Sequence, residues 1–585
     1  MVLLDLLTVG GVVVCLGFVF CAFGLVVARL IRWDWICRQG AGFTAVFGLA
    51  GSILFLEIWN FFFAVNHASV AVLAGFTVCS AVAYRRTVVR VIRRWAFNQS
   101  VVAIGPLLIV LLTVSLFGLG PSEHEHYDTG LYYLNSIRWA QHYPAIPGLA
   151  NLHARLGYNQ STFLMVAFLS RMANLGLARA CQVINPLFVF ISGWAILDRI
   201  RLNVLSAKER RIRLYAILLL CPLLFLATHI YLSAPTSDIV AAAVALPAAL
   251  ALFCSLEEVF ERNGVQAINW IFLLIVCACL SAKLKLSYIV LAGIGIGMAA
   301  TALALVKRRS FFSNWVRAGG LCVLLFLPWM ARGVVLSGYA FYPAKVLRFH
   351  TDWAVPGRNA ERERQWIYSW ARMPGQDPDV VLKNNAWIGS WIERNAKDPE
   401  NVFLALFLIL GLAFGLSSFF IPTDRQRRLL PVLLVAQTLC AVIFWFKTAP
   451  EPRFGYSAIL LCGVNGFYAF TTAILGLSVA RARLCACMIT LGSFSLIGRT
   501  QFPMISSLEK KFPQGFPKAE LEFQTTNSGL RIGVAVHQQV WDSGLLVTPH
   551  CDPDLTLRGP GLREGFRITR EATTEKEEST ANGHE

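Results

Sequence analysis

The feature that most constrains this chain is a succession of apolar segments, each about 20 residues long, separated by short polar or basic stretches. A helix of that length spans the ~30 Å hydrocarbon core of a bilayer and satisfies its own backbone polar groups. A transmembrane barrel would instead show alternating segments of about ten residues. Only 15% of the residues are charged, against about 25% in soluble domains. We therefore predict an all-α, multi-pass membrane protein.

The hydropathy pattern predicts about fourteen crossings. One further apolar stretch, 160–176, carries Arg171 and Asn174, and we predict that it dips into the outer leaflet without crossing. The first segment lacks a cleavage site of small residues and is interpreted as a retained helix. The predicted crossings are 3–28, 41–64, 67–84, 101–119, 180–197, 213–232, 237–255, 268–282, 288–306, 315–335, 402–421, 429–447, 455–477 and 484–500.

Basic clusters orient these segments, because cytoplasmic loops carry an excess of Lys and Arg. The cluster that follows the third segment consists of Arg85, Arg86, Arg90, Arg93 and Arg94. It is predicted to be cytoplasmic, which places the loop 120–160 on the non-cytoplasmic face of the membrane. The net charge of +18 is then explained by cytoplasmic loops, and nucleic acid is not expected as a partner.

Composition also divides the chain. Residues 528–570 alternate weakly in polarity, which predicts a small strand-containing region outside the membrane. The last fifteen or so residues are poor in apolar side chains, which is typical of disorder. The predicted parts are an N-terminal three-helix segment 1–95, a transmembrane bundle 96–500 with outward loops 120–160 and 337–400, a small non-cytoplasmic domain 501–570 and a tail 571–585.

The loop 120–160 concentrates polar side chains between two apolar segments. Asp128 stands just outside a predicted membrane helix, where it could act as a general base or could cap the helix that follows. Histidine and carboxylate side chains are also ligands for Zn or Mn, although their spacing here fits no compact ligand pattern. No cofactor is required, and a divalent metal stays open. The other candidates for substrate or metal binding in this loop are Glu123, His124, Glu125, His126, Arg138 and His153.

Charges at predicted helix ends form a second group of candidates. Lys283 and Lys285 interrupt two apolar segments, and Arg453 stands in PEPRFG. A charge at membrane depth marks a functional site by default, and cations at the outer leaflet could pair with a lipid phosphate. Snorkelling of the long side chains is the alternative. Asp238 in SAPTSD is a further candidate, for which capping of the predicted helix 237–255, by Ser237 or Asp238, is the favoured interpretation.

One apolar helix, a large outward loop with an acidic residue near its start and a many-pass bundle together resemble the GT-C superfamily of integral-membrane glycosyltransferases. More narrowly, YDTGLYYLNSIRWAQHYPAIPGLANLHARLGYNQS resembles a bacterial multi-pass family with a YDTGLYH-type motif followed by PGLxNLHxRL. The likeness extends through SAPTSD, KLS at 285–287, SGYAFYP, APEPRFG and WDSGLLVTP. The family's two tail cysteines are replaced by Val540 and by Val547–Thr548, so no tail disulfide is expected and Cys551 should be unpaired.

This resemblance implies a GT-C-like fold and a transferase. It implies a polyprenyl-phosphate-linked sugar as donor, held at the outer leaflet among membrane lipids, and a non-cytoplasmic glycan, lipid or protein as acceptor. Asp128 would be the catalytic carboxylate, and Lys285 and Arg453 would hold the donor phosphate. No Gly-rich phosphate loop appears in the chain, and a nucleotide is not needed.

Two other classes of function stay open. A transporter or lipid flippase could use the same cations as a phosphate pathway, although no convincing internal repeat supports it. A surface-polysaccharide polymerase or ligase would place its decisive residues in later outward loops, where Arg348 and His350 lie. The transferase hypothesis requires Asp128, Lys285 and Arg453 to line one outward cavity.

Overall fold

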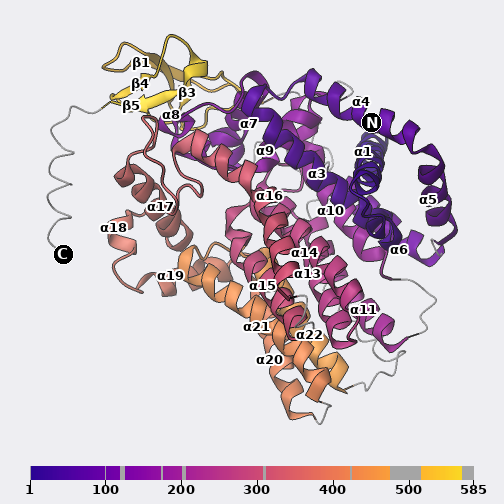
Figure 1. Cartoon of the computed structure of the whole chain (residues 1–585). Coiled ribbons are helices and arrows are strands. Elements are labelled where there is room, and N and C mark those ends of the chain that lie inside the picture. Colours follow the sequence, from indigo (N-terminus) through magenta and orange to yellow (C-terminus); the bar gives the residue numbers. More distant parts are fainter. Residues whose placement is uncertain are drawn as a thin grey trace.

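The computed structural model describes residues 2–98, 101–118, 126–172, 175–200, 206–306, 311–421, 425–474 and 516–569. Over these residues the chain forms a bundle of long helices, with a small β region against one end (Figure 1). Ten of the described helices are long and apolar enough to cross a membrane. They comprise Leu6–Leu30, Ala41–Phe62, Leu177–Leu197, Ser237–Phe260, Gly264–Leu284, Leu286–Ala304, Trp315–Ser337, Pro399–Phe420, Leu429–Thr448 and Tyr456–Ile474.

The described helices differ from the predicted fourteen crossings at particular places. Helix α4 (His67–Ala83) continues into the basic helix α5 (Arg85–Asn98) through a bend of 87°, so this pair is a broken span or a re-entrant loop. The apolar run 213–232 is split between α11 (Ala207–Leu218) and α12 (Leu220–Ala227), and the eight residues of α12 extend only about 12 Å. The predicted crossing 484–500 lies outside the described residues.

Two apolar helices precede and follow the polar segment. Helix α6 (Val101–Gly118) has 18 residues and leads into it. Helix α9 (Ser161–Leu169) has nine residues and rises only about 14 Å, which is too short to cross a bilayer. It packs on α3 (Ala41–Phe62) and α10 (Leu177–Leu197), with every residue buried.

Glycines allow the closest helix pairs to approach. A Cβ on Gly24 of α1 (Val2–Leu30) would lie 2.0 Å from a backbone oxygen of α3, and one on Gly48 of α3 would lie 1.9 Å from a backbone oxygen of α1. Helices α20 (Pro399–Ser417) and α22 (Tyr456–Ile474) meet in the same way, since a Cβ on Gly466 would lie 1.8 Å from the carbonyl oxygen of Gly411. Close backbone approach at small residues is typical of helix packing in membranes.

The other long helices complete the bundle around these pairs. Helices α13 (Ser237–Phe260) and α14 (Gly264–Leu284) pack along their whole lengths at its centre, and α13 is buried almost throughout. The remaining long helices are α15 (Ile289–Val306), α16 (Phe311–Ser337) and α21 (Arg425–Thr448), and a cap beside them holds α17 (Gly357–Arg372), α18 (Pro378–Val381) and α19 (Trp387–Ala396).

The strands lie at the C-terminal end of the described chain, above α7 (Leu134–His142) and α8 (Leu149–Leu152) in Figure 1. They form a three-stranded sheet in the order β1-β2-β3 and a two-stranded sheet of β4 and β5. Their side chains share one apolar core with α7 and α8. The predicted strand-containing region is confirmed, and Cys551 forms no disulfide. The strands are β1 (Leu521–Thr525), β2 (Arg531–Ala535), β3 (Val547–Thr548), β4 (Leu555–Leu557) and β5 (Phe566–Ile568).

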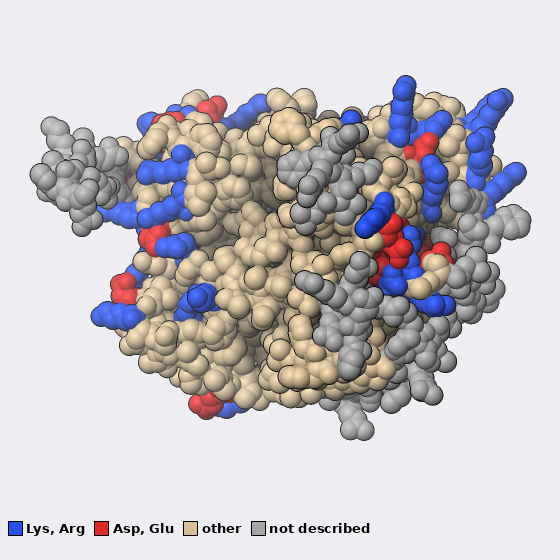
Figure 2. Space-filling model, turned by 60° about the horizontal axis from the view of Figure 1, so that its bottom comes forward, with Lys and Arg blue, Asp and Glu red and all other residues tan. Residues whose placement is uncertain are grey.

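The surface agrees with a bundle that contacts lipid. Figure 2 shows charged side chains gathered toward the two sides of the view, with a broad, largely uncharged surface between them. Large exposed apolar side chains occur along several long helices, among them Phe18, Leu324 and Ile409. An apolar outer surface of this kind is expected of helices that face hydrocarbon.

The orientation of the bundle gives a first testable prediction. Because the Arg85–Arg94 cluster should be cytoplasmic, reporter fusions after residue 95 and after residue 425 should report the cytoplasm. Fusions near residues 125, 370 and 540 should report the opposite face. A cytoplasmic signal near residue 125 would contradict the prediction that the loop 120–160 lies on the non-cytoplasmic face.

Candidate active site

Three membrane helices end next to one another and place charged residues together. Helix α13 begins at Ser237, α14 ends at Leu284 and α22 begins at Tyr456. The chain breaks at these points for local reasons. Thr236 caps α13 by accepting a hydrogen bond from the Asp238 amide, and Lys285 adopts an extended conformation that ends α14.

The segment that begins at His126 lies against these helix ends. It enters the π-helical turn η2 (Thr129–Tyr133) and continues directly into α7. A π-helical turn is rare and often occurs at functional sites. Asp128 immediately precedes η2, and its side chain makes no capping hydrogen bond. The capping interpretation of Asp128 is therefore wrong.

Asp128 is held by two arginines from distant parts of the chain. Its Oδ1 accepts a hydrogen bond from Arg155 Nη1 at 3.0 Å, and its Oδ2 accepts one from Arg453 Nη1 at 3.0 Å. The Asp128 side chain is only 11% exposed. The short helix η3 (Ala154–Gly157) carries Arg155, and the short helix η8 (Pro452–Phe454) carries Arg453.

The two guanidinium groups control the protonation of Asp128. Burial raises the pKa of this carboxyl, but the charges of Arg453 and Arg155 lower it further, so the pKa falls to about 2. Asp128 is therefore ionised at neutral pH. A carboxylate with so low a pKa is a weak base while both arginines are attached. A bound anion that drew Arg453 away would raise the pKa and strengthen the base.

Lys285 and Asp238 form a second ion pair beside the first. The Lys285 ammonium donates to Asp238 Oδ1, and the Thr236 hydroxyl donates to Asp238 Oδ2 at 3.0 Å. Lys285 Nζ also lies 4.0 Å from the centre of the Phe454 ring, next to Arg453. Asp238 thus lies in the first turn of α13 and binds a cation, while Thr236 supplies the cap that was expected from Ser237 or Asp238.

Aromatic rings frame the Arg453 guanidinium. Its central carbon lies 5.4 Å from the centre of the Trp370 ring of α17 and 5.3 Å from that of Phe454. Its Nη1 is 3.3 Å from His126 Nε2. The His126 ring stacks on Tyr133 and meets Tyr231 edge-on. These contacts hold the arginine in one orientation, which simple snorkelling would not require.

Burial keeps the His126 ring neutral. Desolvation is the largest influence and lowers the pKa of His126, and although the Asp128 charge raises it, the net value is about 4. The Nδ1 atom of His126 is buried without a hydrogen-bond partner in the structure. At neutral pH the ring can therefore pack beside Arg453 without repelling it.

The other predicted site residues lie apart from Asp128. Lys283 forms a buried ion pair with Glu57 at 2.8 Å, and Ser161 donates to the same carboxylate at 2.6 Å. Arg138 forms a bidentate pair with Asp542 of the C-terminal region. His153 is partly buried two residues before Arg155, and burial and the Arg155 charge lower its pKa to about 3. Lys283 is thus a core residue and not part of the Asp128 cluster.

Among the residues that the structure describes, no three His, Cys, Asp or Glu side chains are arranged to hold a metal ion. Glu123, His124 and Glu125 lie outside the described residues. Arg348, which the polymerase or ligase hypothesis would use, lies over the Tyr339 ring.

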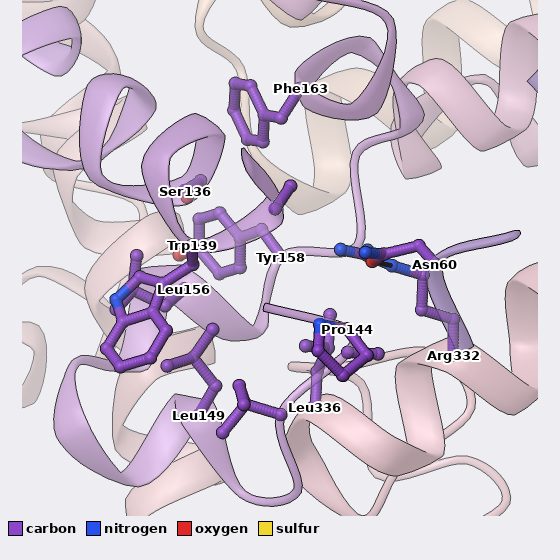
Figure 3. A pocket seen from close by; sticks show the side chains of 13 residues that line it. Asn60, Ser136, Trp139, Pro144, Leu149, Leu156, Tyr158, Phe163, Arg332 and Leu336 are labelled. Atoms are coloured by element: carbon purple, nitrogen blue, oxygen red, sulfur yellow. Dashed lines mark hydrogen bonds between the residues drawn. The ribbon is translucent and has the colours of Figure 1, made fainter. Parts of the chain in front are cut away.

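A small cavity lies beside helix α7, between Trp139, Tyr158 and Arg332 (Figure 3). It measures about 20 Å³ and is lined by α7 residues, by Tyr158 and by Asn60 and Arg332 from the bundle. That volume is close to the space needed by one water molecule. The cavity is therefore too small for a sugar or a lipid headgroup.

Sequence reasoning missed three members of the site. Arg155 is one of the two partners of Asp128, and its position in NLHARL was the available signal. Glu363 approaches Arg155 Nε at 3.9 Å and also accepts from the Tyr158 hydroxyl. Trp370 covers Arg453. Nothing in the local sequence of α17 distinguishes Glu363 and Trp370 from its other polar and aromatic residues.

The buried histidines predict a pH dependence of stability. The unfolded chain binds more protons than the folded chain between pH 6.5 and 4 at His126, so its contribution is full above pH 6.5 and is lost as the pH falls. The loss at His126 amounts to about 3 kcal/mol. We expect the thermal unfolding midpoint in detergent to fall between pH 7 and 4.5, and to fall less in His126→Gln and His153→Gln. The exposed His142→Gln is the control, and equal slopes in all three variants would contradict the assignment.

A model of the family described as Domain of unknown function (DUF8201) matches residues 7–460 of the chain. The match includes the charged residues of the site, Asp128, Arg155, Asp238, Lys285, Glu363 and Arg453, and stops before the strands. No curated protein and no solved structure matches the chain.

Proposed function

The chain belongs to the DUF8201 family, and we propose that it is a membrane glycosyltransferase of the GT-C type. In this proposal it moves a sugar from a polyprenyl-phosphate donor to a glycan, lipid or protein of the cell envelope, at the non-cytoplasmic face of a bacterial cytoplasmic membrane. One observation carries the proposal. A buried carboxylate, Asp128, lies between Arg155 and Arg453, and the cation Lys285 shares the Phe454 ring with Arg453.

The charges suit a lipid phosphate at the membrane surface. Arg155, Arg453 and Lys285 supply three positive charges, which the carboxylates of Asp128, Asp238 and Glu363 offset, so a donor phosphate has to take a cation from its carboxylate partner. A phosphodiester carries one negative charge, and the phosphate that leaves carries more. Fixed cations at that position stabilise the transition state more than the ground state. Arg453 and Lys285 would bind the phosphate, since both contact the Phe454 ring.

Asp128 is the general base of the proposed reaction. The donor phosphate competes for Arg453 and so frees one carboxylate oxygen. The acceptor hydroxyl oxygen then attacks the anomeric carbon, and its proton passes to Asp128. The bond between that carbon and the phosphate oxygen breaks, and polyprenyl phosphate leaves with the electron pair. Arg155 remains attached to Asp128 and orients the carboxylate.

A lipid transporter is the second candidate, and one observation favours it. The pair of Glu57 and Lys283 is almost fully buried inside the bundle, and an intramembrane charge pair can mark an ion or lipid pathway. The hydrogen bond from the Ser161 hydroxyl to Glu57 suits a fixed core equally well. A polymerase or ligase has no comparable support, because Arg348 lies on Tyr339.

The test is an assay of the purified protein in proteoliposomes with synthetic polyprenyl-phosphate sugars. Release of free polyprenyl phosphate that depends on an added acceptor is expected. Movement of intact donor across the bilayer without cleavage would replace the transferase with the transporter. Addition of a chelator in the same assay would test the metal hypothesis separately.

A further inference from the structure

The C-terminal strand region touches the Asp128 segment through one turn, residues 538–544. The Trp541 amide donates to the Gly130 carbonyl oxygen at 2.9 Å. The Tyr127 hydroxyl donates to Gln538 at 3.0 Å, and Gln539 donates to the Tyr127 carbonyl oxygen at 3.1 Å. The turn therefore binds the residues on both sides of Asp128.

The same turn also contacts α7, the helix that follows Asp128 and η2. Asn135 donates to the Gly544 carbonyl oxygen at 3.1 Å. Arg138 and Asp542 form a bidentate ion pair, with 2.5 Å between Nε and Oδ1. These contacts hold successive turns of η2 and α7 against a separate part of the chain, more than 400 residues away in sequence.

The Trp541 ring fits a space that only glycine leaves. A Cβ on Gly130 would lie 2.6 Å from the indole, which is closer than real contacts allow. Trp541 is only 7% exposed and packs with the core of the helical bundle. Gln538 and Trp541 both have positive φ angles, of 63° and 43°. Non-glycine residues in that region of backbone space carry strain, which persists where surrounding contacts fix it and which clusters at functional sites.

We infer that the 538–544 turn is a positioning element for Asp128, with Trp541 and Asp542 as its positioning residues. This inference rests on the proposed function for its kinetic consequence but not for its structural one. The turn touches neither Arg453 nor Lys285 in any described contact, so it sets the place of the base and leaves the binding of the donor phosphate alone. A misplacement of about 1 Å at a catalytic group costs on the order of 100-fold in rate.

Two ion pairs allow a matched comparison. Asp542→Asn breaks the pair with Arg138 beside the site, whereas Asp352→Asn breaks the pair of Asp352 and Arg558, which also ties the C-terminal region to the rest of the chain. The full-length protein in detergent is measured by hydrogen exchange over residues 126–138. Exchange there should rise about 10-fold or more in Asp542→Asn and Trp541→Ala, and should stay unchanged in Asp352→Asn.

Kinetics provide the second measurement. The kcat for sugar transfer should fall about 100-fold in Trp541→Ala, while the KM for the donor changes less than about twofold. Trp541→Phe should recover most of kcat, because a smaller ring still fills the space at Gly130. Gly130→Ala should be damaging alone, and the double variant with Trp541→Ala should be no worse than Trp541→Ala, because the clash is then gone.

Each result bears on the inference. Unchanged exchange over 126–138 in both Asp542→Asn and Trp541→Ala would overturn it, as would equal losses of kcat in Asp542→Asn and Asp352→Asn. Asp542→Asn keeps the test valid if Trp541→Ala fails to fold. Faster exchange over 126–138 in Asp542→Asn and Trp541→Ala, found together with a wild-type protein that transfers no sugar, would leave the positioning role standing and refute the proposed function instead.

Discussion

Asp128→Asn is expected to insert in the membrane and fold, yet to lose about 100- to 10,000-fold in sugar transfer, which is the range for losing a general base. Asparagine preserves the shape of the side chain, but its single amide oxygen can replace only one of the two acceptors that Arg155 and Arg453 now use, because the NH2 group is a donor. It cannot take a proton from the acceptor at neutral pH.

The structure changes the expected effect of this substitution on stability. A substituted cap would cost about 1 kcal/mol or less, but Asp128 makes no capping bond. Instead, its negative charge compensates the positive charges of two guanidinium groups. Its lowered pKa corresponds to about 2 kcal/mol of the free energy of unfolding, which is present above pH 4 and is lost as the pH falls toward 2. We therefore expect a measurable loss of thermal stability, well below the loss of activity.

Asp377→Asn is the matched control for Asp128→Asn. Asp377 does cap a helix, α18, by accepting from the Asp379 amide at 2.8 Å, and asparagine caps equally well. This variant should keep both stability and activity. Full activity in Asp128→Asn would remove the residue from the reaction and make the transporter the leading hypothesis. His126→Gln should be milder than Asp128→Asn, and the same holds for Glu123→Gln, which lies outside the described residues.

Arg453→Gln is expected to reduce transfer by about 100- to 1,000-fold, as the loss of a donor to a developing negative charge typically does. Arg453→Lys restores the charge but not the planar guanidinium group, whose Nη1 contacts both Asp128 Oδ2 and His126 Nε2 while the group lies over Trp370. It should therefore stay about 10-fold below the wild type, because a flexible point charge fixes a phosphate less well.

Arg362→Lys serves as the control for this pair of variants. Arg362 also lies over a tryptophan of α17, Trp366 at 5.5 Å, but it pairs with the exposed Asp377 and Asp379. Its substitution should leave the apparent affinity for donor unchanged. If Arg453→Lys also left that affinity unchanged, only snorkelling would explain the position of Arg453.

The membrane class could be predicted from the sequence, as could the site residues Asp128, Lys285 and Arg453 and the further candidates Asp238 and His126. Asp128, Lys285 and Arg453 are charged residues next to apolar segments. Because burying a charge is costly, such residues can be recognised from the local sequence. Their meeting could not be predicted from the residues alone. Asp128 and Arg453 are 325 positions apart, and only the packing of α13, α14 and α22 brings their loops to one place.

Lys283 and Lys285 illustrate the limit of local reasoning. Both stand in SAKLKLS, at the end of one apolar segment. Lys283 lies in the last turn of α14 and points to Glu57 in the bundle, whereas Lys285 follows the helix in an extended conformation and reaches Asp238. The point where the helix ends decides between the two roles, and sequence patterns place such boundaries only to within a few residues.

Hydropathy reports how long an apolar run is, but not whether the run forms one straight helix. The apolar run 213–232 is long enough to cross, yet it forms two helices that meet at Leu219. The capping box at Ser206 starts α11 well before the apolar run, and its first turns are charged. The bend of 87° between α4 and α5 likewise follows an apolar segment of adequate length. Counts of crossings from hydropathy alone are therefore too high here among the residues described.

The most direct test of the central claim is a single-turnover experiment in proteoliposomes with a labelled polyprenyl-phosphate sugar and an excess of acceptor. Wild-type protein should convert the donor to free polyprenyl phosphate and glycosylated acceptor, and Asp128→Asn should bind the donor but leave it intact. Donor that crosses the bilayer uncleaved, at the same rate in both proteins, would contradict the account.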